Sequence, residues 1–193
     1  MLASHDSYTY LNAVNDVANT ITRFWRCQTK SITEQYKAGV RFFDVRVFRD
    51  TNSNGKKVWR TAHGFAELSK VYASLKAICV YFTASLKGCS MRIWLEKGTD
   101  EEWQEFITEI QPLIEKYPNL LQVVRKDPEV IYYESPTYKK MTMKYYPFQD
   151  WSVKTVLANL FNSPIKDWAE KHNPEITQEM IDDKDTLYMM DYI

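Results

Sequence analysis

The chain of 193 residues is 45% hydrophobic and 26% charged, a balance typical of a folded globular domain. Its 25 Lys and Arg residues offset 25 Asp and Glu residues, and a protein without a basic excess is not expected to bind nucleic acid. No apolar run has the length of a membrane span, and no secretory signal pattern opens the sequence.

The chain begins with a predicted strand, followed by a short helix. Residues 1–6 are read as a buried strand. Ser31, Glu34 and Gly39 have the spacing of an N-cap, its capping-box partner and a residue just past a helix end. We therefore expect a helix between Ser31 and Gly39.

Two strands joined by a turn follow this helix. Residues 40–48 and 58–65 are rich in Val, Phe and Trp, which favour strands. Asn54-Gly55 between them is a strong hairpin signal. Apolar residues at helical spacing then predict a helix over 70–86.

The middle of the chain holds a strand and the most clearly patterned helix. Residues 91–98 are read as the strand, and Thr99 as the N-cap of the helix, which has acidic residues in its first turn. Pro118 follows the end of this helix. Its apolar stripe consists of Trp103, Phe106, Ile107, Ile110, Leu113 and Ile114.

The last third of the chain predicts shorter elements. They are strands at 120–126 and 187–193, two further candidate strands at 130–134 and 140–148, and helices at 152–161 and 165–172. Strands alternating with helices imply a mostly parallel sheet with helical crossovers, so the expected fold class is α/β. Because no repeat or linker interrupts the pattern, we expect a single domain over residues 1–193.

Cysteine and histidine are rare in this sequence. Cys27, Cys79 and Cys89 lack metal-like spacing, and we expect reduced thiols in a cytoplasmic protein, with export after processing left open. His172 lies in a polar helix end and is read as a solvated side chain.

The other two histidines, His5 and His63, each stand at the end of an apolar strand, just before a turn. The carboxyl ends of parallel strands are where active sites are built. For each histidine the alternative is a structural role with two hydrogen-bond partners.

The hairpin brings charged residues near His63. A two-residue turn at Asn54-Gly55 sets Arg46 directly opposite His63, with Asp44 on the same face. A guanidinium, a carboxylate and an imidazole then converge. The alternative is the polar face of an exposed hairpin, and a longer loop would shift the register.

The end of the chain supplies another carboxylate. Asp191 lies between apolar residues of the last predicted strand. Because a barrel brings its last strand beside its first, Asp191 is placed to accept a hydrogen bond from His5 and fix its tautomer. The alternative is a carboxylate at a frayed end.

Five blocks of the sequence together resemble a known family. They are SHDSYTY, YKAGVRFFDVRVF, WRTAHGF, MRIWLEKG and MMDYI. Their order and approximate spacing are similar to those of the bacterial phosphatidylinositol-specific phospholipase C catalytic domain, over the first half of the chain and its last strand. The resemblance implies an irregular or truncated TIM-like (β/α) barrel, because the chain is shorter than the ~250 residues of a full barrel.

The resemblance implies an acid–base pair with two supporting carboxylates. His5 resembles the general base that deprotonates the inositol 2-hydroxyl, and Asp191 the carboxylate that orients this base. His63 resembles the general acid that protonates the diacylglycerol oxygen, and Asp6 the carboxylate beside this acid.

The remaining site residues are carried over in the same way. Arg46 resembles the arginine that stabilises charge on the phosphoryl oxygens, and Asp44 the acidic residue that braces it. Lys97 and Arg125 match basic residues that line the headgroup site. Aromatic candidates for stacking on the sugar ring or touching a membrane are Tyr145 and its neighbours Tyr132, Tyr133 and Tyr146, with core packing as the alternative.

These roles imply a phosphodiesterase of the phospholipase C type. Two histidines act as base and acid near neutral pH, and attack by the neighbouring hydroxyl gives a cyclic inositol phosphate that water can open. The expected partner is a phospholipid or glycerophosphodiester, with transient membrane-surface contact and no cofactor. Metal-dependent relatives carry an acidic residue near the place of Arg46, so a metal-independent site is expected.

Two other functions stay open at this point. One is a binding or structural assembly protein that keeps the barrel and the motifs but lacks a usable pocket. The other is a metal-dependent glycerophosphodiester phosphodiesterase, which EDTA would inactivate.

Overall fold

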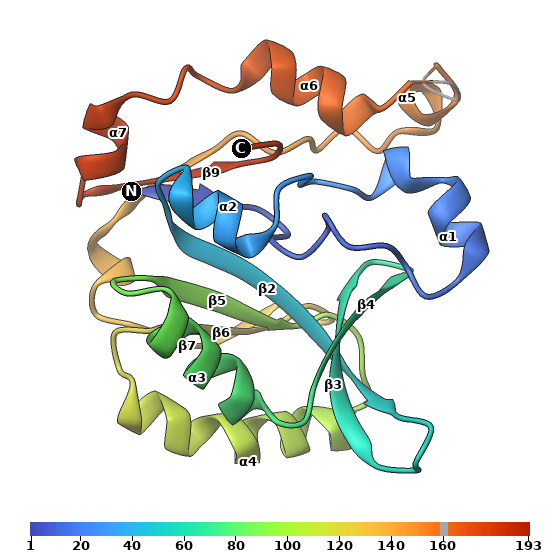
Figure 1. Cartoon of the computed structure of the whole chain (residues 1–193), viewed down its shortest axis with the longest axis vertical. Helices are drawn as coiled ribbons and strands as arrows, with labels where there is room; N and C mark the ends of the chain where they lie inside the picture. Colours follow the sequence, from blue (N-terminus) through green and yellow to red (C-terminus); the bar gives the residue numbers. More distant parts are fainter. Residues whose placement is uncertain (159–161) are drawn as a thin grey trace.

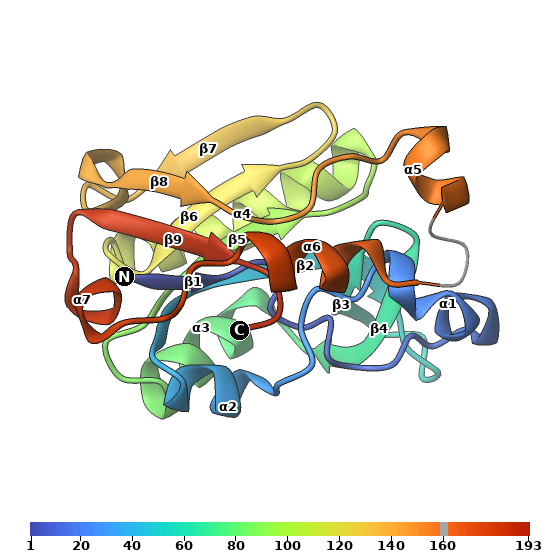
Figure 2. The same cartoon turned by 90° about the horizontal axis from the view of Figure 1, so that it is seen from above.

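The computed structural model describes residues 1–158 and 162–193, which form a curled sheet with helices around it (Figure 1 and Figure 2). The strands run in the order β7-β6-β5-β2-β1-β9-β8, with β3 added to β2 and β4 added to β3. Their bounds are β1 (Leu2–Ser4), β2 (Val40–Thr51), β3 (Lys57–His63), β4 (Ala66–Tyr72), β5 (Ser90–Leu95), β6 (Leu121–Arg125), β7 (Val130–Glu134), β8 (Thr142–Tyr145) and β9 (Thr186–Met190).

Most strand pairs of the described residues are parallel, as the alternation of strands and helices predicts. β1 pairs with β2 and β9, β2 with β5, β5 with β6, and β8 with β9 in parallel, whereas β2–β3, β3–β4 and β6–β7 are antiparallel. β7 and β8, at the two ends of this order, have no ladder between them in the described part of the chain. The sheet therefore curls without closing, and the fold is an irregular, truncated TIM-like (β/α) barrel, as expected.

Helices cover the outside of this sheet. In Figure 1, α3 (Leu75–Ser85) and α4 (Asp100–Lys116) lie side by side below it, and α6 (Pro164–His172) runs above β9. The other helices are α1 (Asp16–Thr20), α2 (Ile32–Lys37), α5 (Val153–Ala158) and α7 (Gln178–Asp182), with 3-10 turns at Thr22–Phe24 and Tyr138–Lys140. None of the helices in the described residues is long and apolar enough to cross a membrane.

Alternation along β2 separates an apolar core from a polar interior. Phe43, Val45 and Val47 belong to the main core, which also holds the apolar stripe of α4. Asp44 and Arg46 are also buried, but they point to the opposite face because successive side chains of a strand alternate. Burial of each large apolar side chain on the outer face stabilises the fold by about 1.5–3 kcal/mol. This stabilisation keeps the charged groups on the inner face of the curled sheet.

The hairpin register predicted from the turn is wrong by one residue. Val47 pairs with Thr61 and Asp50 with Val58, so Arg46 does not lie opposite His63. The cause is a five-residue loop in which the side-chain oxygen of Asn52 accepts hydrogen bonds from the backbone N–H groups of residues 54 and 56. The Asn-Gly pair therefore lies inside a longer loop instead of forming the two-residue turn.

The helix predicted over 70–86 is also partly wrong. Residues 66–72 form β4, and α3 begins only after the N-cap Ser74, whose side chain accepts a hydrogen bond from the backbone of Ala77. The capping box of α2 at Ser31 and the N-cap Thr99 of α4 are present as predicted, and Glu102 completes a capping box at Thr99. The helix predicted over 152–161 is described as far as Ala158, and its last residues lie outside the described part of the chain.

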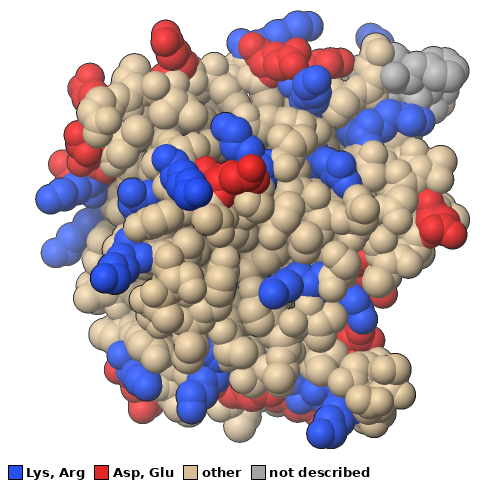
Figure 3. Space-filling model, in the orientation of Figure 1, with Lys and Arg blue, Asp and Glu red and all other residues tan. Residues whose placement is uncertain are grey.

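The charged side chains of both signs are interspersed on the surface. On the face drawn in Figure 3, lysines and arginines alternate with acidic residues, and broad uncharged areas separate them. This distribution agrees with the net charge of zero.

Candidate active site

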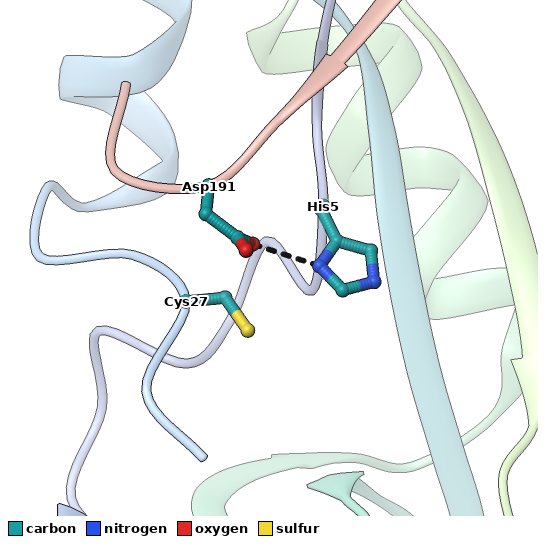
Figure 4. A group of neighbouring side chains, drawn as sticks. All are labelled: His5, Cys27 and Asp191. Atoms are coloured by element: carbon teal, nitrogen blue, oxygen red, sulfur yellow. Dashed lines mark hydrogen bonds and ion pairs between the residues drawn. The ribbon is translucent and has the colours of Figure 1, made fainter. Parts of the chain in front are cut away.

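The first and last strands bring His5 and Asp191 together. The backbone N–H of His5, just after β1, donates to the carbonyl of Met190 at the end of β9. The Nδ1 atom of His5 then lies 2.8 Å from Oδ1 of Asp191 (Figure 4), and both side chains are buried. The second carboxylate oxygen of Asp191 accepts from the backbone of Phe148. The contact expected from barrel closure is therefore present.

Asp6 lies between the two imidazoles. Its Oδ2 is 3.2 Å from Nε2 of His5 and 3.1 Å from Nε2 of His63. The ring centroids are 6.3 Å apart, with the rings nearly perpendicular. Asp6 has a φ of 45°, a left-handed conformation that aspartate tolerates better than most residues. This turn directs the carboxylate back toward both rings.

Arg46 fills the centre of this cluster. Its Nε lies 2.5 Å from Oδ1 of Asp6, and its Nη2 donates to Oδ2 of Asp44 at 3.1 Å. The same Nη2 is 3.1 Å from Nε2 of His5. Asp44 also accepts from Nε of Arg92, because β2 and β5 pair in the register that sets these two residues side by side. Two arginines thus hold one buried carboxylate.

The electrostatics of the cluster favour ionised carboxylates. Burial alone would raise the pKa of Asp6, but Arg46 and then His63 lower it below its usual value. Burial acts in the same direction on Asp44, and Arg92 and Arg46 lower its pKa far below the usual range. For His5, burial opposes the charged form, but Asp6 and Asp191 outweigh burial and raise its pKa.

The hydrogen bonds distinguish the two histidines. At His5, Nδ1 faces the carboxylate of Asp191, whereas Nε2 lies near Oδ2 of Asp6 and also near two donors, Nη2 of Arg46 and the hydroxyl of Tyr145. The two donors suit a lone pair on Nε2. At His63, Nδ1 is 2.5 Å from the carbonyl oxygen of Trp25 and Nε2 faces Asp6. Both nitrogens of His63 thus lie beside an acceptor.

Tyr145 also reaches the first histidine. It stands at the end of β8, and its hydroxyl lies 3.2 Å from Nε2 of His5. Burial raises its pKa, so its phenol keeps the proton at neutral pH. Tyr132 and Tyr133 lie elsewhere, with hydroxyls that donate to Gln111 and to the carbonyl of Pro118.

The structure places Lys97 and Arg125 away from this cluster. Lys97 forms an ion pair with Glu67, and Arg125 forms one with Asp100. Both lie one residue away from the positions that face inward, because side chains alternate along β5 and β6 and just beyond their ends. Their role in binding a headgroup therefore stays a prediction.

Their chain neighbours Glu96 and Lys126 do face the cluster. The Glu96 carboxylate is 3.5 Å from Nη1 of Arg46, accepts the backbone N–H of Gly64 at 2.7 Å, and forms an ion pair with Lys126. The alternation that places Arg92 inward on β5 also predicts this side for Glu96, so the sequence contained a signal for it.

Cys27 is a further residue of the site that sequence analysis missed. Its Sγ lies 3.7 Å from Oδ2 of Asp6 and 3.9 Å from Nδ1 of His63, and it is only 2% exposed. Burial, then Asp191 and Asp6, raise the pKa of this thiol well above its usual value. The segment around it is irregular, so no periodicity in the sequence indicates that it faces the histidines.

An apolar cavity of about 380 Å³ opens beside His63. Its walls consist of Ile21, Phe24, Trp25, His63, Gly64, Phe65 and Trp151. Phe65 and Trp151 remain about half exposed. His5 is not among the lining residues, and its side chain is 9% exposed, whereas the side chain of His63 is 16% exposed. The two rings therefore differ in their access to solvent.

The metal-ligating capacity of the centre is limited by Arg46. Ligand atoms of His5, Asp6 and Asp44 all lie within 4.8 Å of one another, a spacing suited to a cation. However, the guanidinium already contacts each of these three residues at 2.5–3.1 Å. A fixed positive charge thus occupies the place that a hard divalent cation would take.

His172 has the surroundings expected of a solvated side chain. It ends α6, is exposed, and stacks on Trp168 with ring centroids 3.7 Å apart. It is not part of the cluster around Asp6.

Comparison with solved structures shows the same fold in a phospholipase. The phosphatidylinositol-specific phospholipase C from Listeria monocytogenes aligns with a TM-score of 0.57 and 16% identity, over 100% of this chain and 87% of that chain. One structure of the enzyme of the same name from Staphylococcus aureus aligns with a TM-score of 0.47 and 16% identity, over 97% of this chain and 70% of that chain. No protein-family model matches the chain, and no curated protein matches it significantly in sequence.

At this level of identity the Listeria structure establishes a shared fold. The chain has the irregular TIM-like barrel of the bacterial phosphatidylinositol-specific phospholipases C, as its sequence blocks suggest. The chemistry that this chain performs must be argued from its own residues.

Proposed function

We propose that this chain cleaves phosphodiesters of the (glycero)phosphoinositol type by general base and general acid catalysis with two histidines. The observation that carries the proposal is the arrangement of His5 and His63 on either side of Asp6, with ring centroids 6.3 Å apart and Arg46 in contact with His5 and Asp6. In-line displacement at phosphorus needs a base, an acid and a fixed cation, and this cluster supplies all three.

In the proposed reaction, His5 acts on the attacking hydroxyl. Its Nε2 takes the proton of the inositol 2-hydroxyl, and the freed oxygen forms a bond to phosphorus. The bond from phosphorus to the glycerol oxygen breaks, and Nε2–H of His63 protonates that oxygen. Arg46 stabilises the charge on the phosphoryl oxygens. The cyclic product is then opened by water with the two roles reversed.

The surroundings of each ring support this assignment of roles. The donor Nη2 of Arg46 keeps a lone pair on Nε2 of His5, whereas His63 has acceptors at both nitrogens. Asp191 is proposed to hold His5 in the tautomer with the proton on Nδ1, so that Nε2 remains the basic atom.

The cavity beside the acid supports an apolar leaving group. Its apolar walls reach His63, the residue proposed to protonate that group. A diacylglycerol fits this chemistry better than a charged alcohol does, because buried charges without partners are costly. Proposed contact with a membrane surface would come from the exposed rim residues Phe65 and Trp151.

The reaction is proposed to need no metal ion. Arg46 provides the positive charge at the place where a divalent cation would bind to His5, Asp6 and Asp44. EDTA is therefore expected to leave the rate unchanged, whereas a metal-dependent glycerophosphodiester phosphodiesterase would lose its activity.

The test compares histidine variants on two substrates in the presence of EDTA. His5→Ala and His63→Ala should each lower the rate by about 10²–10⁴-fold on phosphatidylinositol vesicles and on soluble glycerophosphoinositol. His172→Ala is the matched control and should keep the wild-type rate, because that ring is exposed on α6. Phosphorus nuclear magnetic resonance distinguishes a cyclic inositol phosphate from the product that water has opened.

An unchanged rate in either His5→Ala or His63→Ala would remove that residue from the mechanism.

A second candidate, a binding protein without turnover, is favoured by one observation. Nε2 of His5 is already in contact with Arg46 and Tyr145, and the side chain is 9% exposed. Calorimetric binding of inositol phosphate without cleavage of either substrate would support that candidate.

A further inference from the structure

Cys27 lies close to the proposed base His5 and to its partner Asp191. Figure 4 shows its sulfur beside the pair formed by His5 and Asp191. One ligand atom from each of these three residues lies within 4.8 Å of the other two, and all three side chains are buried. The arrangement combines a thiol, an imidazole nitrogen and a carboxylate oxygen around one small volume.

The charge of Asp191 is only weakly compensated at this place. Among the ion pairs of the described residues, its partner is His5, and neither a lysine nor an arginine contacts it. Its other oxygen accepts from the backbone N–H of Phe148, and the thiol of Cys27 also donates to the Asp191 carboxylate. By contrast, Asp6 and Asp44 are held by Arg46. A cation placed beside Asp191 therefore meets a carboxylate that has no fixed positive partner.

We propose that His5, Cys27 and Asp191 bind a thiophilic divalent cation of the Zn²⁺ class, and that this cation inhibits the enzyme. Sulfur, imidazole nitrogen and carboxylate oxygen are the donor types that Zn²⁺ accepts in tetrahedral sites, with a water molecule as the fourth ligand. Mg²⁺ and Ca²⁺ prefer oxygen ligands alone, so they are not expected to bind. Only the inhibition rests on the proposed function; the binding does not.

Binding redistributes two protons. The thiol of Cys27 releases its proton to solvent and coordinates as thiolate. The proton on Nδ1 of His5 is replaced by the metal and moves to Nε2, so the ring remains neutral. Asp191 stays ionised, and the charges of cation, thiolate and carboxylate then cancel. Nε2 now carries a proton and cannot accept another from a substrate hydroxyl, which is why binding inhibits.

A second set of donors, Asp6, Cys27 and His63, shares the same sulfur. We favour the set with His5, because Nε of Arg46 lies 2.5 Å from Oδ1 of Asp6 and repels a cation there. The ion reaches the site past His63, where the cavity opens to solvent. A variant on the Asp6 side therefore discriminates between the two sets.

The binding test uses Co²⁺, which gives a sulfur-to-metal charge-transfer absorption when a thiolate coordinates it. The reduced wild-type protein should show this band with one equivalent of Co²⁺, and Zn²⁺ should abolish it. Cys27→Ala and Cys27→Ser should lack the band. Cys89→Ala is the matched control and should retain it, since that residue lies outside the cluster. Asp191→Asn should weaken binding by at least about 10–100-fold, and His63→Ala should not.

Two results would overturn the site. One is a wild-type protein without the band at millimolar Co²⁺; the other is a band that persists in a folded Cys27→Ser protein. Loss of the band in His63→Ala together with its retention in Asp191→Asn would also overturn this assignment, because it would move the ion to the Asp6 side.

The inhibition test compares each protein with its own metal-free rate. Zn²⁺ should inhibit the wild type, and the concentration for half inhibition should rise at least about 10–100-fold in Cys27→Ser. Mg²⁺ should have no effect on either protein. Equal sensitivity to Zn²⁺ in both would overturn the inhibition. A protein that binds Co²⁺ but cleaves neither substrate would instead refute the proposed function and leave the metal site standing.

Discussion

Two imidazoles of the same chemistry are given different hydrogen-bonding environments. His5 has a carboxylate on Nδ1, and its Nε2 faces a guanidinium as well as Asp6, whereas His63 has acceptors at both nitrogens and no arginine beside it in the described residues. A base needs a free lone pair and an acid needs a proton, so the neighbours of each ring match the role proposed for it.

Removing the charge of Asp191 should change both the height and the position of the pH–rate profile. Asp6 and Asp191 raise the pKa of His5 against the effect of burial, so Asp191→Asn lowers that pKa. Because the base acts unprotonated, the acidic limb of kcat/KM should move to lower pH. The maximum should fall by about 10²–10⁴-fold, since the tautomer is no longer fixed. An acidic limb that stays in place would contradict the assignment of His5 as the base.

The raised pKa of His5 also makes the stability of the folded protein depend on pH. A histidine whose pKa is raised on folding stabilises the folded state most below its unfolded pKa, and loses this contribution as the pH rises through its folded pKa. The free energy of unfolding should therefore fall less between pH 6 and 8 in Asp191→Asn than in the wild type. Urea unfolding at several pH values measures this difference and serves as a control that does not depend on substrate.

The turn between β3 and β4 positions His63. His63 pairs with Ala66, so Gly64 and Phe65 form a two-residue turn. Gly64 has a φ of +56°, and its N–H donates to Glu96. A glycine with positive φ in the first place of such a turn is typical of type II′ geometry, which suits the twist of a hairpin. The turn thereby ties His63 to the carboxylate that also contacts Arg46.

Replacing Gly64 with alanine should reduce both stability and activity. A Cβ at this position meets no atom within 4 Å, so the cost comes from the positive φ and is about 1–2 kcal/mol. Relaxation of the turn displaces His63, and we expect the rate to fall by about 10–100-fold. Gly55→Ala is the matched control, because Gly55 has a φ of +72° and open space around it, but lies in the distant loop between β2 and β3.

The control should lose similar stability in urea unfolding and keep its rate. Equal rates in Gly64→Ala and Gly55→Ala would mean that the turn does not position the acid.

The elements around the site differ in how far the sequence predicts them. The capping box at Ser31 and the N-cap at Thr99 are local, since the interacting residues lie within one turn of helix, and the sequence predicts both correctly. The hairpin register fails because the side chain of Asn52 organises a longer loop, and nothing in the Asn-Gly pair reports that competition.

The site residues likewise differ in whether a local sequence pattern predicts their position. Alternation along β2 places Asp44 and Arg46 on one face, as the sequence predicts. Cys27 lies in an irregular segment without a period, so its approach to the histidines depends on tertiary packing that the sequence pattern does not encode. Lys97 follows Glu96 and forms its ion pair with Glu67, and its predicted role at the headgroup site stays a prediction.

At the scale of the whole molecule, the cavity beside His63 opens at a rim with exposed aromatic residues. Phe65 is 56% and Trp151 46% exposed, and both line the cavity. An aromatic side chain with one apolar face and solvent contact suits the boundary between a membrane and water. Under the proposed function, this rim is where a lipid substrate is expected to enter.

Truncation of this rim should affect vesicles more than soluble substrate. Trp151→Ala should lower the rate on phosphatidylinositol vesicles by about tenfold, which corresponds to ~1.4 kcal/mol. Its rate on glycerophosphoinositol should change little. Tyr132→Ala removes an aromatic residue of similar exposure from β7, outside the cavity, and should leave both rates unchanged. Equal losses on both substrates in Trp151→Ala would exclude a role in binding the lipid surface.

The parallel ladder between β1 and β9 joins segments from opposite ends of the chain, and the residues of the pair His5 and Asp191 are 186 positions apart. Contacts of such long sequence separation form late, because the entropy of closing the loop must be overcome before they contribute. On a ribosome, β1 is made before β9 and cannot form this ladder until Thr186–Met190 have been synthesised. Up to that point the growing polypeptide holds the proposed base without the carboxylate proposed to orient it.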